Sequence, residues 1–250
     1  MRISKENIKL KDNEIIELIK IDQFKQGEKE KYVKELLNIS KAVGQDPEGY
    51  VYEWLKKSDL FLFAKSKKFN SPIGFTLANF YRNEDIIYIP AAMVLPQYQK
   101  KEIATKFIKK IVKIFFLHKL KYSLKDIFSP FYFLFRTQNP LIYFEFYKYN
   151  LSLYPSFNKN KKTPTKINNI ASKFAKILWP YASFDKNTFV LKDAYKSCPG
   201  LIVEPNNISW SKNELINKEF KKRLNLNKKS FDALIVIVEI NFFSVFKAFF

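Results

Sequence analysis

Cysteine, histidine and arginine are scarce in this sequence of 250 residues. Cys198 is the only cysteine, so no disulfide can form within the chain, and with a single histidine it excludes a thiolate or imidazole zinc cluster. Magnesium or calcium held by carboxylates stays open, although no acidic run has the spacing of a calcium-binding loop. We therefore expect no metal site.

Long apolar runs are also missing. No run approaches the roughly 18 to 20 residues that span a bilayer, and residues 1–14 have no apolar signal core behind their charges. We expect a cytoplasmic protein without a membrane span. Because 47% of the residues are hydrophobic, the chain can bury a substantial core, as one large domain or one domain with an elaboration.

Positive charge is abundant, with a formal net charge of +20 that comes almost entirely from lysine. Clustered cations attract polyanions, so the charge suits a nucleic acid or an acidic partner. Base readout and bidentate phosphate recognition favour arginine, however, which occurs only at positions 2, 82, 136 and 223. Lysine, asparagine, isoleucine and phenylalanine are abundant together, which is typical of an AT-rich genome. We interpret most of the charge as a solvated surface of a basic protein.

The apolar periodicity predicts a mixed α/β fold. The elements expected in the first 155 residues are a strand at 14–19, helices at 28–43 and from Asp46-Pro47, strands at 60–65, 74–81 and 86–95, a helix at 101–120, a strand at 131–136 and a helix at 139–149. Asp46 and Asn139 are each followed by proline, which predicts an N-cap and a first helical residue. Pro90 predicts a bulge or an edge position in its strand.

The sequence changes character beyond Pro155. A polar, lysine-rich connection at 158–166 leads to a predicted helix at 165–179, short strands at 188–191 and 201–203, a helix at 212–224 and a buried strand at 232–240. We predict a core over residues 1–155 and an insertion over 156–230. Residues 231–250 hold the last strand, which returns to the core sheet, and an apolar tail.

One motif runs from the strand at 86–95 into the helix at 101–120. Its sequence, Val94-Leu-Pro-Gln-Tyr-Gln99-Lys-Lys-Glu102-Ile-Ala104, resembles the acetyl-CoA signature of the GCN5-related N-acetyltransferase (GNAT) family, V-x-P-x-x-[RQ]-x-x-G-x-[GA]. A helix N-terminus presents free amides and a positive dipole end, which bind a diphosphate without any particular side chain. The resemblance implies a GNAT fold and a cofactor contact at Gln99, Lys100, Lys101, Glu102, Ile103, Ala104 and Thr105.

Glu102 departs from the signature, because it stands where the family has glycine. A carboxylate in the first turn of a helix stabilises the empty helix but repels a bound anion. Either the side chain points outward and does little, or the site is weakened.

A second resemblance lies at Thr137-Gln-Asn139-Pro-Leu-Ile-Tyr143, which is similar to the strand-to-helix junction of GNAT enzymes. It implies that the Asn139 side chain touches the pantetheine arm, although a role as N-cap alone stays open. The family also implies that the main chain of Met93, Val94 and Leu95 pairs with the pantetheine amides, as an added strand would.

The proton-transfer groups are harder to assign. In the family, the acid that protonates the leaving thiolate is often a tyrosine seven residues after the asparagine, and that position here is Phe146. Tyr143 and Tyr147 flank it on a common helical face, and we favour Tyr147, with core packing as the alternative for either. Glu84 and its neighbour Asp85 are candidates for the general base by position only.

These observations predict an N-acetyltransferase that transfers an acetyl group from acetyl-CoA to an amine by direct attack. The alternatives are a catalytically degenerate GNAT-fold binding protein, and a basic protein that binds nucleic acid or an acidic carrier protein. We expect acetyl-CoA and an amine acceptor as partners, rather than nucleic acid. The acceptor and the oligomeric state are left open.

Overall fold

The computed structural model describes residues 3–10, 15–21, 28–99, 101–122, 128–149, 151–158 and 161–243. The described chain forms two compact units, which meet in the sequence at Ser129 and Pro130. The boundaries predicted after residues 155 and 230 divide the chain by sequence character rather than by spatial contacts, so they stay predictions.

The first unit contains an antiparallel sheet. Its strands are β1 (Ile3–Lys9), β2 (Ile15–Ile21), β3 (Leu60–Ser66), β4 (Ser71–Tyr81), β5 (Ile86–Tyr88) and β6 (Ala92–Val94). The order is β1-β2-β3-β4, and the long strand β4 pairs with both β5 and β6. The strand predicted at 86–95 is therefore broken in two. The register against β4 shifts by one residue across the break that holds Pro90, so the predicted bulge is confirmed.

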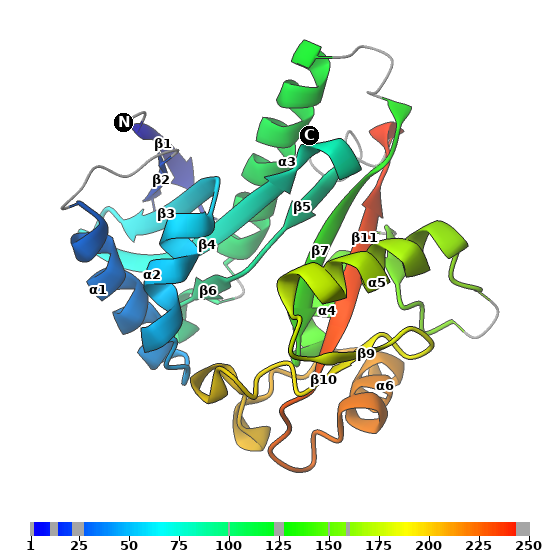
Figure 1. Cartoon of the computed structure of the whole chain (residues 1–250). Coiled ribbons are helices and arrows are strands. Elements are labelled where there is room, and N and C mark those ends of the chain that lie inside the picture. The colour runs from blue at the N-terminus through cyan, green and yellow to red at the C-terminus, as the bar shows by residue number, and fades with distance from the viewer. Residues whose placement is uncertain are drawn as a thin grey trace. The chain divides into compact units, whose positions relative to one another are not determined.

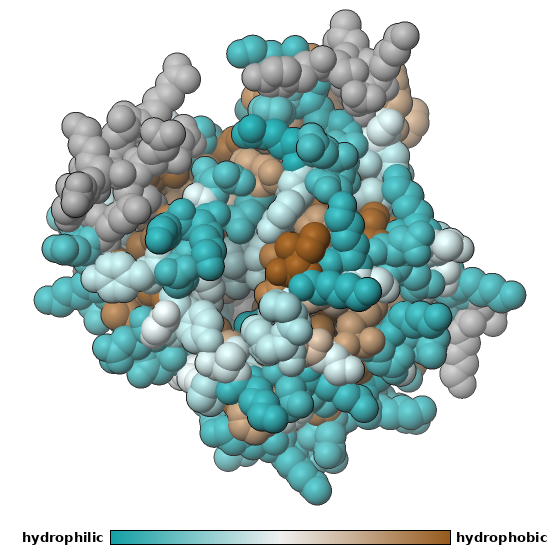
Figure 2. All heavy atoms as spheres, viewed as in Figure 1, coloured by the Kyte–Doolittle hydropathy of each residue, from teal (hydrophilic) through white to brown (hydrophobic). Residues whose placement is uncertain are grey.

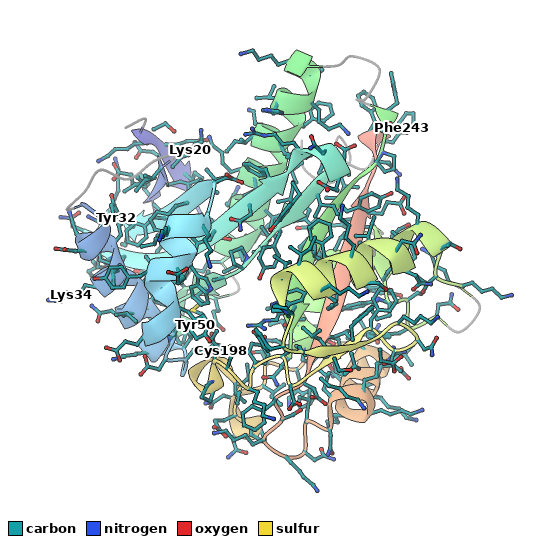
Figure 3. The ribbon with its side chains drawn as sticks, viewed as in Figure 1. Lys20, Tyr32, Lys34, Tyr50, Cys198 and Phe243 are labelled. Atoms are coloured by element: carbon teal, nitrogen blue, oxygen red, sulfur yellow. The ribbon has the colours of Figure 1, made fainter. Side chains whose placement is uncertain are left out.

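Helices cover both faces of this sheet (Figure 1). Helices α1 (Glu28–Ala42) and α2 (Glu48–Lys57) lie on one face and α3 (Ile103–Tyr122) on the other. Tyr32 of α1 packs edge-on against Phe61 and Phe63 of β3, with ring centroids 5.5 and 5.6 Å apart (Figure 3). Such aromatic contacts anchor the helix through buried apolar area.

The predicted cap of α2 is wrong by one residue. Pro47 is the N-cap rather than the first helical residue, and it makes no side-chain cap hydrogen bond. The amides of Tyr50 and Val51 donate to the Pro47 carbonyl at 2.7 and 3.1 Å. Because this carbonyl starts the hydrogen bonding of the helix, Asp46 lies one position too early to cap it.

The second unit is built around β11 (Ala233–Ile240), whose first six residues are buried. It pairs along its length with β7 (Phe131–Thr137), so the last predicted strand does join the strand at 131–136. Strands β8 (Ser152–Tyr154) and β10 (Val190–Lys192) also pair with β11, and β9 (Ser183–Asp185) pairs with β10. Helices α4 (Pro140–Tyr147), α5 (Thr165–Leu178) and α6 (Glu214–Leu224) complete the unit.

No strand forms at 201–203, where one was predicted. Residues Pro199–Leu201 form a 3₁₀ turn instead. The amide of Val203 donates to the side-chain oxygen of Gln138 at 2.9 Å, so this polar group is satisfied outside any sheet.

Arg136 of β7 contacts the segment that follows α5. Its guanidinium donates to the Ala194 carbonyl and lies over the rings of Tyr195 and Trp179, 4.3 and 5.4 Å from their centroids. A guanidinium between aromatic faces is held by cation–π attraction as well as by hydrogen bonds. Part of the predicted insertion is thus tied to β7 by one side chain.

Candidate functional site

Strand β6 presents main-chain groups at its outer edge. The Leu95 amide donates to the Ile73 carbonyl at 2.9 Å, and the Leu77 amide donates to the Ala91 carbonyl at 3.0 Å. Main-chain groups of alternate residues in an antiparallel strand point to opposite edges. The groups of Met93 and Leu95 therefore point toward β4, whereas those of Ala92 and Val94 point away from it.

This register divides the residues that the sequence proposed for main-chain contact with a ligand. Of Met93, Val94 and Leu95, only Val94 has its amide and carbonyl on the outer edge. Ala92, which the sequence did not suggest, shares that edge. The one-residue shift at the bulge decides which residues of β6 point their main-chain groups outward. The sequence motif alone does not reveal this shift.

The turn after β6 is held against the strand by Gln99. Its side-chain amide donates to the Val94 carbonyl at 3.1 Å, while its main-chain amide donates to the Leu95 carbonyl at 3.1 Å. A 3₁₀ turn at Pro96–Tyr98 lies between them, with Tyr98 buried. Gln99 therefore fixes the angle at which the chain leaves β6 for α3.

Glu102 has a left-handed backbone, with φ at 65°. This conformation favours glycine, because other residues bring their Cβ close to the carbonyl oxygen, at about 1 kcal/mol. Its carbonyl accepts the first hydrogen bond of α3, from the Lys106 amide at 2.9 Å. The structure thus gives a reason for the glycine of the signature, which Glu102 replaces at a conformational cost.

The first turn of α3 presents amides beyond this corner. Because the first helical bond starts at Lys106, the amides of Ile103, Ala104 and Thr105 have no acceptor within the helix. Lys101 adds a cation, with its ammonium 5.0 Å from the centre of the Tyr98 ring. Lys100 lies outside the described residues.

Ala104 has a small, exposed side chain in the first turn of α3. Phe107, Ile111 and Phe115 follow it at helical spacing and are all buried, but Ala104 itself is exposed. Its small side chain lets a ligand approach the amides of this first turn.

Asn139 caps α4 in the second unit, as predicted. Its side-chain oxygen accepts from the Leu141 amide at 2.9 Å, and its own amide donates to the Thr137 hydroxyl at 2.9 Å. The cap role is therefore present, while the proposed contact of Asn139 with pantetheine stays a prediction.

The two tyrosines of α4 have different surroundings. Tyr143 is 2% exposed, its hydroxyl donates to the Pro155 carbonyl at 2.8 Å, and its ring stacks on Phe157. Burial raises the pKa of this phenol well above its usual range. Tyr147, by contrast, is 51% exposed. Phe146, at the family position of the acid, stacks on Phe135 in the core.

The acidic candidates lie at the turn between β4 and β5. Asp85 forms a salt bridge with Lys119 of α3 at 2.8 Å, and only 6% of the Lys119 side chain is exposed. Glu84 is half-buried in a 3₁₀ turn at Arg82–Glu84. β5 starts two residues after Glu84 and pairs with residues 79–81 of β4, whereas β6 pairs with residues 74–76. The structure does not bring Glu84 to β6.

Within the described ranges, no three His, Cys, Asp or Glu side chains come together as a metal site. None of the helices that the structure describes is both long and apolar enough to cross a membrane. Hydrophilic residues cover most of the face shown in Figure 2.

The sequence profile of the acetyltransferase (GNAT) family matches residues 22–130, which include β6, the turn and α3. No curated protein matches the chain. Among solved structures, an IAA acetyltransferase from Bacillus cereus ATCC 14579 is 15% identical, with 90% of this chain and 99% of that chain covered and a TM-score of 0.45. A GNAT-family acetyltransferase from Streptococcus pneumoniae TIGR4 is 20% identical over 40% of this chain and 67% of that chain, with a TM-score of 0.32.

Proposed function

Because residues 22–130 are a GNAT acetyltransferase domain, we propose that the chain is an N-acetyltransferase that transfers an acetyl group from acetyl-CoA to an amine. The observation that carries the proposal is the corner formed by β6, the turn at Gln99 and the first turn of α3. Outward main-chain groups of the strand lie on one side of that turn, and helix amides that have no acceptor within α3 lie on the other.

The two parts of this corner match two parts of coenzyme A. The pantetheine arm carries amides, which hydrogen-bond to the outward groups of Ala92 and to the outward amide of Val94 as a neighbouring strand would. The Val94 carbonyl already accepts from Gln99. The diphosphate is held by the amides of Ile103, Ala104 and Thr105 and by the positive end of the α3 dipole. The exposed position of Ala104 gives the diphosphate access to these amides.

In the proposed reaction, the neutral amine attacks the thioester carbon, a C–N bond forms and the C–S bond breaks. The amine proton leaves through water, and the departing thiolate takes a proton. We assign that proton to Tyr147 rather than Tyr143, because the Tyr143 hydroxyl is buried and already donates to Pro155. Positioning of the reactants and main-chain hydrogen bonds to the thioester oxygen supply most of the rate.

A second candidate function is binding of acyl-CoA without turnover. Two observations favour it. The family position of the acid is Phe146, which packs in the core, and Glu102 stands where the signature has glycine, just before the first turn of α3. The corner of β6 and α3 serves equally well in a protein that only binds the cofactor.

Thermal unfolding and an acceptor screen together test the proposal. Acetyl-CoA at 100 times its dissociation constant should stabilise the fold by about 2.7 kcal/mol. Release of free thiol on addition of amines then identifies turnover. An unchanged melting curve at millimolar acetyl-CoA would rule out both functions, whereas stabilisation without thiol release from any amine would leave the second.

Val94→Pro tests the binding mode, with Val94→Ala as control for the lost side chain. Proline removes the outward amide of Val94 but none of the hydrogen bonds to β4. We expect about tenfold weaker acetyl-CoA binding in the proline variant relative to the alanine variant. Equal affinities would show that this amide does not contact the ligand.

A further inference from the structure

Helix α3 is basic along one face. Its 20 residues, Ile103–Tyr122, include six lysines and no aspartate or glutamate. Four of them recur at helical spacing, and we refer to them as the lysine stripe: Lys106, Lys109, Lys110 and Lys113. Phe107, Ile111 and Phe115 on the other side of the helix are buried. Within the stripe, Lys113 is exposed and the other three lysines are half-buried.

Charge within α3 is not balanced by internal ion pairs as it is in α2 and α6. Lys57 pairs with Glu53 in α2, and Arg223 pairs with Glu219 in α6, each over one helical turn. Because α3 contains no acidic residue, no such pair can form within it. Lys110 is bridged to Glu6 of β1, and the buried Lys119 pairs with Asp85. Counted over its own residues, α3 therefore has a positive net charge, and the stripe holds four of its six lysines.

The stripe begins at the corner described above and runs away from it. Lys106 follows directly after the amides of Ile103, Ala104 and Thr105, within reach of an anion bound there. Lys113 lies seven residues further, about 10 Å along the helix axis. One small anionic group at the corner does not contact the whole stripe, which is long enough to face a helix of a protein.

Glu102 stands at the start of the stripe, with a left-handed backbone next to the first-turn amides of α3. A carboxylate there repels the diphosphate and 3′-phosphate of coenzyme A more than it repels a single phosphodiester. The local charges thus favour a phosphopantetheine arm with one phosphate, combined with a further negative surface along α3.

We propose that the lysine stripe docks an acidic carrier protein, whose phosphopantetheine arm delivers the acyl thioester to β6. This inference rests on the proposed function and names the carrier of its acyl donor. The C–S bond of the arm breaks in place of that of acetyl-CoA, and the thiol stays on the carrier. The stripe contains lysine and no arginine, which suits a carboxylate-rich protein surface better than the readout of a nucleic acid.

The test compares three ligands: an acyl carrier protein with its phosphopantetheine arm, the same carrier without the arm, and coenzyme A. Affinities are measured by calorimetry at about 50 and 300 mM salt, which screens exposed charges to different degrees. Lys109→Glu with Lys113→Glu reverses two charges of the stripe. Lys218→Glu with Lys222→Glu is the matched control, because these exposed lysines are also four residues apart, in α6.

We expect the stripe variant to bind both forms of the carrier at least about tenfold more weakly at low salt, and coenzyme A at most about threefold more weakly. The control variant should change each affinity by less than about twofold. Carrier binding that is absent, or equally weakened in both variants, would overturn the inference. So would tighter binding of a DNA duplex than of the carrier at the stripe. If neither coenzyme A nor the arm contributes to binding, the proposed function fails, even where the carrier without its arm still docks.

Discussion

Gly74 of β4 lies against the main chain of β6, so that a Cβ atom at position 74 would stand 2.9 Å from the Met93 carbonyl oxygen. Cβ atoms do not approach a backbone oxygen so closely, and any side chain there forces the two strands apart. The absence of a side chain at this buried position therefore sets the position of β6, whose outer edge carries the proposed ligand contacts.

Gly74→Ala should lower the free energy of unfolding by about 1 to 3 kcal/mol, since overpacking against the backbone must shift β6. It should also weaken acetyl-CoA binding. Urea unfolding and a titration measure the two effects. Gly49→Ala is the control, because nothing lies within 4 Å of its added Cβ and alanine favours the helix. If Gly74→Ala is no less stable than Gly49→Ala, the close approach of β4 and β6 is contradicted.

Three substitutions of Glu102 separate its backbone strain from its charge. Glycine and, less fully, asparagine tolerate the left-handed backbone, so Glu102→Gly should raise stability by about 1 kcal/mol and Glu102→Asn by less. Glu102→Gln keeps the strained backbone and loses the favourable charge at the helix N-terminus, so it should lower stability by about 0.5 kcal/mol. All three remove the carboxylate, so all three should tighten coenzyme A binding at low salt, and the gain should shrink as salt is added. Tighter binding by the glycine variant alone would assign the effect to the backbone.

The two tyrosines of α4 should respond differently to loss of the hydroxyl. Tyr143→Phe removes a buried hydrogen bond to Pro155 and should lower stability by about 1 kcal/mol. Tyr147→Phe should leave stability intact and lower the catalytic rate about 100-fold with a working acceptor, because it removes the proposed acid. Full activity in the Tyr147 variant would exclude it from the mechanism, and full activity in both would leave solvent as the proton source.

Glu35 of α1 should make stability depend on pH. Its Oε2 atom is buried without a hydrogen-bond partner among the described residues, and burial raises the pKa of this carboxyl above 4.5. In the unfolded chain the group loses its proton at lower pH, so its contribution to stability falls as pH rises above about 4.5. Glu35→Gln should therefore stabilise the fold at pH 7, and the gain should vanish near pH 4.

Glu53→Gln is the control of opposite sign for this measurement. The hydrogen bond from Lys57 lowers the pKa of Glu53. The stability that this exposed carboxylate contributes is therefore present at neutral pH and declines as pH falls through its folded-state pKa. Unfolding curves between pH 4 and 8 compare the two variants. A Glu35 variant that gains no stability at neutral pH would show that Lys31 and Lys65 already compensate the buried charge.

Elements with strong local signals could be predicted from the sequence. Asn139 before Pro140 fixes the start of α4, and the continuous apolar run at 233–238 is long enough to be read as β11. Strand β1 was missed because its residues are mostly polar and exposed, as at the edge of a sheet. The strand predicted at 201–203 does not form. The amide of Val203 instead donates to the side chain of Gln138, the residue that follows β7.

The candidate site was predictable to the same degree. The signature located the corner of β6 and α3 because it depends on residues close in sequence. Which main-chain groups face outward depends on pairing with β4, and burial of Tyr143 depends on contacts with Phe157 and Phe220 far along the chain. Tyr147 shares a helical face with Tyr143, yet it is exposed. It is the last residue of α4, and the sequence did not predict where this helix ends.

Because of the bulge at Pro90, the register of β6 against β4 depends on the number of residues between β5 and β6 more than on their types. Deleting one residue between Tyr88 and Ala92 would give β6 the register of β5 and turn the strand over. Met93, whose sulfur accepts a hydrogen bond from Ser40 of α1, would then exchange faces with its neighbours. Homologous chains should therefore conserve the number of residues in this stretch more strictly than their types, because the number keeps the main-chain groups of Ala92 and Val94 on the outer edge of β6.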